Sequence, residues 1–543
     1  MISVTFTNVN AQNRNRVSID TMQIRHAAAV MGIAFDSTEL VQMAGGVSRQ
    51  INSFKEIRDY NVPNWVSPSV QFNPFPIGIN VPDHNIHPNW DIPNNIDLPD
   101  KKEDIAFMQI DELASLIKNK KISSLELTKL FISRLKKYNS ELFCVINFTE
   151  EYALEMAKKA DDEIAKGLYR GILHGIPYGV KDLLAHPDYP TTWGAKPFEN
   201  QTINQTATVI KKLEDAGAIM VAKLSLGALA MGDVWFGGTT RNPWNTKNGS
   251  SGSSAGPAST VSAGLLPFAI GSETLGSIVS PSTRCSVTGL RPGFGRVSKY
   301  GAMALSWSMD KLGPICRSAR DCAIVFDAII GADEFDRSVV NSGFSYPILS
   351  DLSSLKIGYI KDLFESDYPF KDNDEKIIST MKDLGAELID ITLPEDIPVS
   401  ALRIILNAEA AAAFDQLTLS SLDSLLTSQS NWSWPNSFRT ARFIPAVEYI
   451  NANRIRTDLV QAVNKLFSQY DIIVAPSYVG NQLTMTNLTG HPALLVPTGF
   501  DKKSNPTSIT LLGYHFSEGT LCAVGQLIQE KTELHKRRPS GYN

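Results

Sequence analysis

A block rich in glycine, serine and proline, from Gly237 to Gly301, holds the residues best suited to nucleophilic chemistry. Glycine permits close backbone approach and unusual dihedral angles, and hydroxyl groups supply nucleophiles and proton relays. The block also contains apolar runs such as AGLLPFAI, which a flexible linker would lack. The sequence therefore predicts an active site in this block, with a serine as the nucleophile.

One candidate nucleophile is Ser254, at the centre of the pentapeptide GSSAG. This pentapeptide fits the G-x-S-x-G nucleophile elbow of α/β-hydrolases, which also requires a histidine further along the chain. His491, His515 and His535 satisfy that order. However, an elbow needs a strand that runs into the turn, and the preceding residues RNPWNTKNGSSG are typical of a loop. An esterase that uses Ser254 is therefore the remote alternative.

The other candidate is the set Lys181, Ser253 and Ser277, which lie in HGIPYGVKDLL, SGSSAGPA and GSETLGSIVSPS. These stretches resemble the amidase signature family, whose patterns read approximately GIPxxVKD, GGSSGGSAA and DTGGSIRxPA. Further similar stretches, including KLSLGALAMG, RNPW and TGHPALLVPTGF, follow in the expected order. The resemblance covers the chain from about Asp104 to its end.

The resemblance implies a Ser-Ser-Lys triad and an amidohydrolase that cleaves a carboxamide C–N bond without a metal or organic cofactor. Ser277 would be the acylated nucleophile, Ser253 the bridging serine after a cis peptide bond, and Lys181 the base. These residue types suit the roles. A serine hydroxyl is a poor nucleophile until a base takes its proton, and a lysine can be that base only if burial lowers its pKa. A hydroxyl both donates and accepts, so Ser253 can pass the proton on.

The resemblance also implies an oxyanion hole. The hole would consist of the backbone amides of Thr274, Leu275, Gly276 and Ser277, which would meet the charge that develops on the substrate carbonyl. This chain has Leu275 and Val279 where the family commonly has glycine and arginine, which puts the substrate and the details of the hole in doubt. Met231 and Gly232 are expected to contact the substrate.

Composition excludes several other classes of protein. The chain has 543 residues, 43% of them hydrophobic and 20% charged, with a net charge of -5. This composition predicts a globular protein without the positive charge that nucleic acid or anionic lipid would attract. The first residues lack the apolar stretch of a signal peptide, and no apolar run is long enough to span a membrane. We therefore expect a soluble cytoplasmic protein whose partner is a small amide, with homo-oligomers left open.

Metal and disulfide chemistry have no support in the sequence. The five cysteines form no CxxC motif and are expected to be small buried residues. They are Cys144, Cys285, Cys316, Cys322 and Cys522. There is no HExxH motif and no phosphate-binding loop. The histidines are expected to be packing or loop residues, because a Ser-Ser-Lys relay does not need imidazole.

Helical and strand patterns alternate over most of the chain. A helix at 207–217 precedes a strand at 218–223, and a helix at 457–469 precedes a strand at 471–476. The segment 123–139 begins with a Ser123–Glu126 capping box and repeats apolar residues at helical spacing. Helices that alternate with short apolar strands form a sheet covered on both faces. The predicted fold is an α/β/α sandwich around a central mixed β-sheet.

Three units are predicted along the chain. Residues 1–60 form a small helical segment, residues 61–103 a proline-rich strap that lies on the main domain, and residues 104–543 the catalytic domain. The first two units resemble the small C subunit of tRNA-dependent amidotransferases. That resemblance raises a second hypothesis, in which the chain is the A-type glutaminase subunit of such an amidotransferase.

Overall fold

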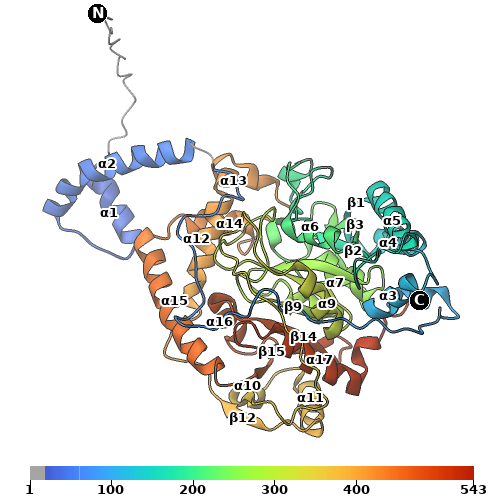
Figure 1. Ribbon diagram of the computed structural model, residues 1–543. Coiled ribbons are helices and arrows are strands. Elements are labelled where there is room, and N and C mark those ends of the chain that lie inside the picture. The colour runs from blue at the N-terminus through green and yellow to red at the C-terminus, as the bar shows by residue number, and fades with distance from the viewer. Residues whose placement is uncertain (1–18, 60–61, 543) are drawn as a thin grey trace, which may run out of the picture.

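The computed structural model describes residues 19–59 and 62–542, and a mixed eleven-stranded β-sheet forms its centre (Figure 1). Its strands are β1 (Val145–Phe148), β2 (Pro177–Lys181), β3 (Ile219–Leu224), β8 (Phe268–Glu273), β9 (Thr288–Arg291), β10 (Lys311–Cys316), β11 (Ile357–Ile360), β12 (Leu388–Ile391), β13 (Ile472–Pro476), β14 (Ala493–Phe500) and β15 (Pro506–Leu512). Their order is β1-β3-β2-β8-β10-β9-β14-β15-β13-β11-β12. The β2 strand runs parallel to both of its neighbours, β3 and β8. The strands β10, β9, β14 and β15 lie side by side in that order, and each runs antiparallel to the next.

Helices surround this sheet (Figure 1). They are α1 (Thr21–Val30), α2 (Ser37–Asp59), α3 (Ile110–Lys118), α4 (Ser124–Leu142), α5 (Glu150–Ala165), α6 (Thr208–Asp215), α7 (Ala255–Ser262), α8 (Val279–Cys285), α9 (Ala319–Ile329), α10 (Lys361–Glu365), α11 (Lys371–Asp383), α12 (Ile404–Ala413), α13 (Asp415–Leu419), α14 (Trp434–Ala441), α15 (Ala446–Phe467), α16 (Gln482–Thr489) and α17 (Glu518–Thr532). Short 3-10 helices lie at Lys102–Phe107, Lys196–Phe198, Ala228–Ala230, Ala401–Arg403, Leu422–Leu425 and Leu534–Lys536.

Two adjacent residues of β9 show that helices cover both faces of the sheet. A Cβ atom at Gly289 would meet Ser282 of α8, whereas the Thr288 hydroxyl accepts a hydrogen bond from Gln529 of α17. Because successive side chains of a strand point to opposite faces, α8 and α17 lie on opposite sides of the sheet. The α7 helix packs with α8, and α9 packs with α17. The predicted α/β/α sandwich with a mixed sheet is confirmed.

Two local predictions need correction. The helix predicted at 457–469 is the second half of α15, which begins at Ala446. Its first turns were missed because Val447 and Ile450 are exposed, so the apolar residues there do not form a buried stripe. The segment predicted as a loop before Ser254 contains the hairpin β6 (Arg241–Asn242) and β7 (Asn245–Gly249). This hairpin lies outside the central sheet.

The strap packs closely on the main body. Residues 62–100 form neither helix nor strand. The Phe72 ring lies 3.5 Å from the guanidinium carbon of Arg456, and the indole N–H of Trp90 donates to Asp327 at 2.8 Å. Hydrogen bonds and aromatic contacts therefore fix this segment against elements far away in the sequence.

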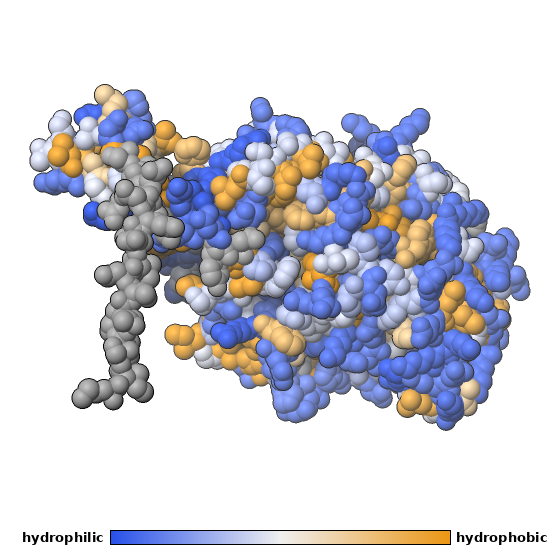
Figure 2. Space-filling view, turned by 90° about the horizontal axis from the view of Figure 1, so that it is seen from above, coloured by the Kyte–Doolittle hydropathy of each residue, from blue (hydrophilic) through white to orange (hydrophobic). Residues whose placement is uncertain are grey.

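The N-terminal helices α1 and α2 project from one end of the molecule (Figure 1). They carry exposed apolar side chains such as Val41 and Ile57, and Figure 2 shows apolar and polar residues interspersed on this face. No helix within residues 19–59 and 62–542 combines the length and apolar character that a bilayer span requires.

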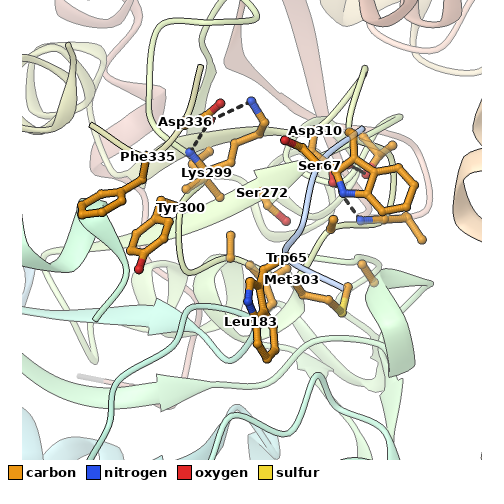
Figure 3. A pocket seen from close by; sticks show the side chains of 17 residues that line it. Trp65, Ser67, Leu183, Ser272, Lys299, Tyr300, Met303, Asp310, Phe335 and Asp336 are labelled. Atoms are coloured by element: carbon orange, nitrogen blue, oxygen red, sulfur yellow. Dashed lines mark hydrogen bonds and ion pairs between the residues drawn. The ribbon is translucent and has the colours of Figure 1, made fainter. Parts of the chain in front are cut away.

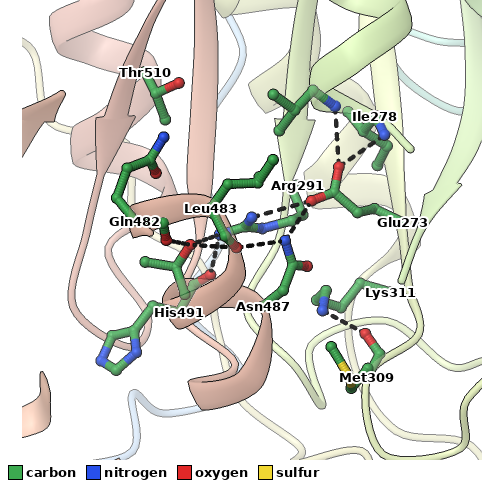
Figure 4. A network of polar contacts seen from close by, with 12 residues as sticks. Glu273, Ile278, Arg291, Met309, Lys311, Gln482, Leu483, Asn487, His491 and Thr510 are labelled. Carbon is green, nitrogen blue, oxygen red and sulfur yellow. Dashed lines mark hydrogen bonds and ion pairs between the residues drawn. The ribbon is translucent and has the colours of Figure 1, made fainter. Parts of the chain in front are cut away.

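A buried polar network holds the loop that follows β8 (Figure 4). The Glu273 carboxylate is fully buried and accepts from Arg291 at 3.1 Å and from the Asn487 amide at 2.8 Å. Its second oxygen accepts from the backbone N–H groups of Ile278 and Val279. Burial opposes ionisation of Glu273, but the Arg291 charge and these donors outweigh it and lower its pKa. The network thus joins β8, β9 and α16 to the start of α8.

We predict that Arg291→Met lowers the free energy of unfolding by about 3–5 kcal/mol, because it leaves the buried Glu273 carboxylate without its cation. The exposed Arg284 of α8 provides the control, and Arg284→Met is expected to change stability by about 0.5 kcal/mol or less. Denaturant unfolding followed by circular dichroism measures both variants. Equal stability of the two variants would contradict the assigned role of this network.

Candidate active site

Lys181 lies at the end of β2, where every residue is buried, and its side chain is fully buried as well. Its amine donates to the hydroxyls of Ser253 at 2.7 Å and Ser272 at 2.8 Å. Weaker contacts reach the Ser254 hydroxyl at 3.2 Å and the Ser272 carbonyl at 3.4 Å. All of these acceptors are neutral oxygens.

The surroundings of Lys181 favour its uncharged form. Burial lowers the pKa of Lys181 from 10.5 to about 7, and the more distant charges of Asp310 and Glu273 only partly oppose this shift. Among the described residues, no carboxylate forms an ion pair with Lys181. The adjacent Asp182 pairs instead with Lys223, at 2.9 Å. Lys181 is therefore a buried lysine whose amine can exist in its uncharged form near neutral pH.

The bridging serine of the predicted triad follows a cis peptide bond, between Gly252 and Ser253, as the resemblance implies. A Cβ atom at residue 252 would lie 1.8 Å from the carbonyl oxygen of Gly232, so only glycine fits there. This contact places the Met231–Gly232 segment directly beside the turn that carries Ser253. Contact of Met231 and Gly232 with a substrate remains a prediction.

Ser277 lies in the short loop between β8 and α8 and is 8% exposed. Its carbonyl accepts from the backbone N–H of Ser254 at 3.1 Å, which ties this loop to the segment that contains Ser253. Gly276 has a φ of 84°, whereas Leu275 does not have a positive φ. The leucine that replaces the family's usual glycine therefore stands where the backbone does not require glycine.

The amide N–H groups of this loop are available to a ligand. Within the described residues, those of Leu275, Gly276 and Ser277 donate no intramolecular hydrogen bond. The next two amides, of Ile278 and Val279, bind Glu273 and are occupied. The loop therefore has two sets of backbone N–H donors: one set stabilises the loop itself, and the other could bind a substrate.

Ser254 is fully buried and has a structural role. Its hydroxyl donates to the Ser272 carbonyl at 3.0 Å and accepts from the Ser272 N–H at 3.1 Å, which joins α7 to β8. No hydrogen bond among the described residues links Ser254 to a histidine. His491 and His515 stack on each other with ring centroids 4.3 Å apart, and both are buried. The geometry does not support a nucleophile elbow at Ser254.

The structure adds two residues to this region that the sequence reasoning missed. Ser272 is the second close hydroxyl partner of Lys181. Asp310 accepts from the Thr274 hydroxyl at 2.6 Å and from the Leu305 N–H at 2.8 Å, and burial raises the pKa of its carboxyl. Ser272 stands in the same GSETLGSIVSPS stretch as Ser277, whereas nothing in the sequence linked Asp310 to Thr274. All five cysteines are buried and unpaired, as predicted.

Comparisons with known proteins identify the family of the chain. Residues 126–522 match the family described as Amidase. The A subunit of the glutamyl-tRNA(Gln) amidotransferase of Coxiella burnetii (strain Dugway 5J108-111) is 31% identical over 477 residues, which cover 79% of this chain and 98% of that protein.

Two solved structures share the fold. An amidase family protein from Bacillus anthracis str. Ames has a TM-score of 0.72 at 27% identity, covering 81% of this chain and 93% of that one. The peptide amidase from Stenotrophomonas maltophilia has a TM-score of 0.71 at 25% identity, covering 81% of this chain and 100% of that one. The chain is a member of the amidase family, enzymes that act on C–N bonds.

Proposed function

We propose that this enzyme hydrolyses a carboxamide through an acyl-enzyme on Ser277, with Ser253 and Lys181 as a proton relay. One observation carries the proposal: a fully buried lysine whose amine contacts only neutral oxygens, one of them the Ser253 hydroxyl at 2.7 Å. A lysine in this environment can take up a proton near neutral pH, which an ordinary surface lysine cannot.

In the proposed acylation step, neutral Lys181 accepts the Ser253 proton while Ser253 accepts the proton of Ser277. The Ser277 oxygen forms a bond to the carbonyl carbon of the amide, and the carbonyl oxygen becomes negatively charged. The C–N bond then breaks as the relay returns the proton to the departing nitrogen. An acyl-ester on Ser277 and a free amine or ammonia result.

The loop amides would stabilise the negatively charged oxygen. The N–H groups of Leu275, Gly276 and Ser277 are available for this role, and the proposed hole also includes the N–H of Thr274. Removing a single donor of this kind costs about 2.7–4 kcal/mol in other hydrolases. Water then attacks the acyl-ester with the same relay as its base, which releases the carboxylic acid and restores Ser277.

We also propose that the N-terminal segment and the strap stabilise the catalytic domain of the same chain. In this division, the N-terminal unit is residues 1–60, of which the structure describes 19–59, the strap is residues 61–103, and the catalytic domain is residues 104–543. The contacts of Phe72 and Trp90 with the main body support it. Because this stabilising segment is part of the same chain, we expect the enzyme to act as a free-standing hydrolase.

We predict that a sulfonyl fluoride forms one covalent adduct, on Ser277, because the relay makes this hydroxyl the most nucleophilic. Intact mass followed by peptide mapping locates the adduct. Ser277→Ala should abolish the adduct and lower amide hydrolysis at least about 10³-fold. Ser254→Ala is the matched control from the same block and should still be labelled. An adduct on Ser254 in the wild-type enzyme would overturn the assignment.

The names of the curated relatives favour a second candidate more directly than free hydrolysis. The A subunit of a glutamyl-tRNA(Gln) amidotransferase is 31% identical to this chain and is covered by it almost completely. In this candidate the same Ser277 chemistry releases ammonia from glutamine for a partner protein. The N-terminal segment would then stand in for a small accessory protein.

Ammonia release from glutamine separates the two candidates. As a free-standing hydrolase, the purified chain should cleave simple amides such as propionamide and phenylacetamide without any partner. It should cleave glutamine at least about tenfold more slowly than these simple amides. A preference of this size requires only a modest difference in transition-state binding between the two kinds of substrate. Coupled ammonia detection measures all three substrates. Glutamine as the preferred substrate, or activity that requires added amidotransferase subunits, would favour the second candidate.

A further inference from the structure

A pocket lies between the strap and the ends of strands β8 and β10 (Figure 3). It opens to solvent. Ser272 and Thr274 form part of its wall. Ser272 is one hydrogen bond from Lys181, and Thr274 begins the loop that ends at Ser277. The pocket therefore adjoins the proposed reaction centre.

The strap supplies the outer wall of this pocket through Trp65 and Ser67. A pair of hydrogen bonds holds this part of the strap in place. The Asn64 side chain accepts from the Ala304 N–H at 2.8 Å and donates to the Ala304 carbonyl at 2.9 Å. Ala304 itself lines the pocket, so Asn64 fixes the position of Trp65 over it.

Four aromatic side chains line the pocket. Besides Trp65, these are Trp307, Tyr300 and Phe335, of which the last two stack with ring centroids 4.2 Å apart. The indole nitrogen of Trp307 is buried and has no hydrogen-bond partner among the described residues. The pocket thus offers flat apolar surfaces to a ligand.

The charged groups that line the pocket already have partners, either an ion of opposite charge or hydrogen-bond donors. Lys299 forms an ion pair with Asp336 at 3.0 Å, as Figure 3 shows. Asp310 accepts from the Thr274 hydroxyl and from the backbone of Leu305. A charged ligand group would need a partner of opposite charge to offset its desolvation, and these residues do not leave one free. The pocket therefore suits an uncharged group.

We propose that this pocket receives an uncharged aromatic group of the amide substrate, and that Trp65 of the strap is a specificity-determining residue. The substrate class would be aryl or arylalkyl amides, whose flat ring fits between the indole and phenol walls. This inference rests on the proposed function, because it places the ring beside the amide that Ser277 attacks. It gives the strap a part in substrate selection in addition to its packing role.

The test compares phenylacetamide with propionamide in Trp65→Ala, Trp65→Phe and Asn64→Ala. In Trp65→Ala, kcat/KM for phenylacetamide should fall about tenfold or more, since an aromatic contact is lost, while that for propionamide stays within about twofold. Asn64→Ala should follow the same direction, and Trp65→Phe should restore most of the loss. Trp432, which is 87% exposed, gives the control variant Trp432→Ala. Circular dichroism and thermal melting verify folding.

A binding measurement separates this inference from the proposed function. Phenylacetamide is titrated by calorimetry into Ser277→Ala with and without Trp65→Ala. Weaker binding upon loss of Trp65 supports the inference even if no amide is hydrolysed. If amides are cleaved but Trp65→Ala affects both substrates equally or neither, the inference is wrong and the proposed function stands. Equal binding to both Ser277→Ala proteins would likewise overturn the inference.

Discussion

Exclusion of water from the Lys181 amine is the constraint on which the rest of the site depends. Moving the pKa of this amine from 10.5 to about 7 corresponds to a penalty on its charged form on the order of 5 kcal/mol. The fold maintains that penalty by placing Lys181 on β2, between β3 and β8 in the interior of the sheet. It then surrounds the amine with hydroxyl and carbonyl oxygens rather than carboxylates. An acid at hydrogen-bond distance would stabilise the ammonium and remove the base.

The same region shows how negative charge is kept close to the site without reaching the lysine. Glu273 follows Ser272 on β8, and because successive side chains of a strand point to opposite faces, its carboxylate points away from Lys181. There it binds Arg291 and the amides at the start of α8. One strand therefore places a neutral hydroxyl beside Lys181, the proposed base, and an anchoring carboxylate beside the loop that holds Ser277.

The sequence was most informative where function depends on contiguous motifs. Lys181, Ser253 and Ser277 could be chosen because each stands in a short recognisable pattern, and the alternation of helices and strands predicted the sandwich. Contacts between distant segments could not be predicted in this way. The hydrogen bond between Asp310 and Thr274 forms only when β10 pairs with β8. Trp65 lies against the pocket only because the Asn64 side chain hydrogen-bonds to the backbone of Ala304. The proline-rich segment has no periodic pattern of apolar residues from which the contact between Asn64 and Ala304 could be predicted.

The most direct measurement of the central claim is the pH dependence of the rate at which a sulfonyl fluoride modifies Ser277, which needs no knowledge of the natural substrate. Because only neutral Lys181 can accept a proton, the rate should rise about tenfold per pH unit at low pH and level off near pH 7. Lys181→Met should remove this dependence and react slowly throughout. A wild-type rate that keeps rising toward pH 10, as for a lysine of ordinary pKa, or an unchanged profile in Lys181→Met, would contradict the account.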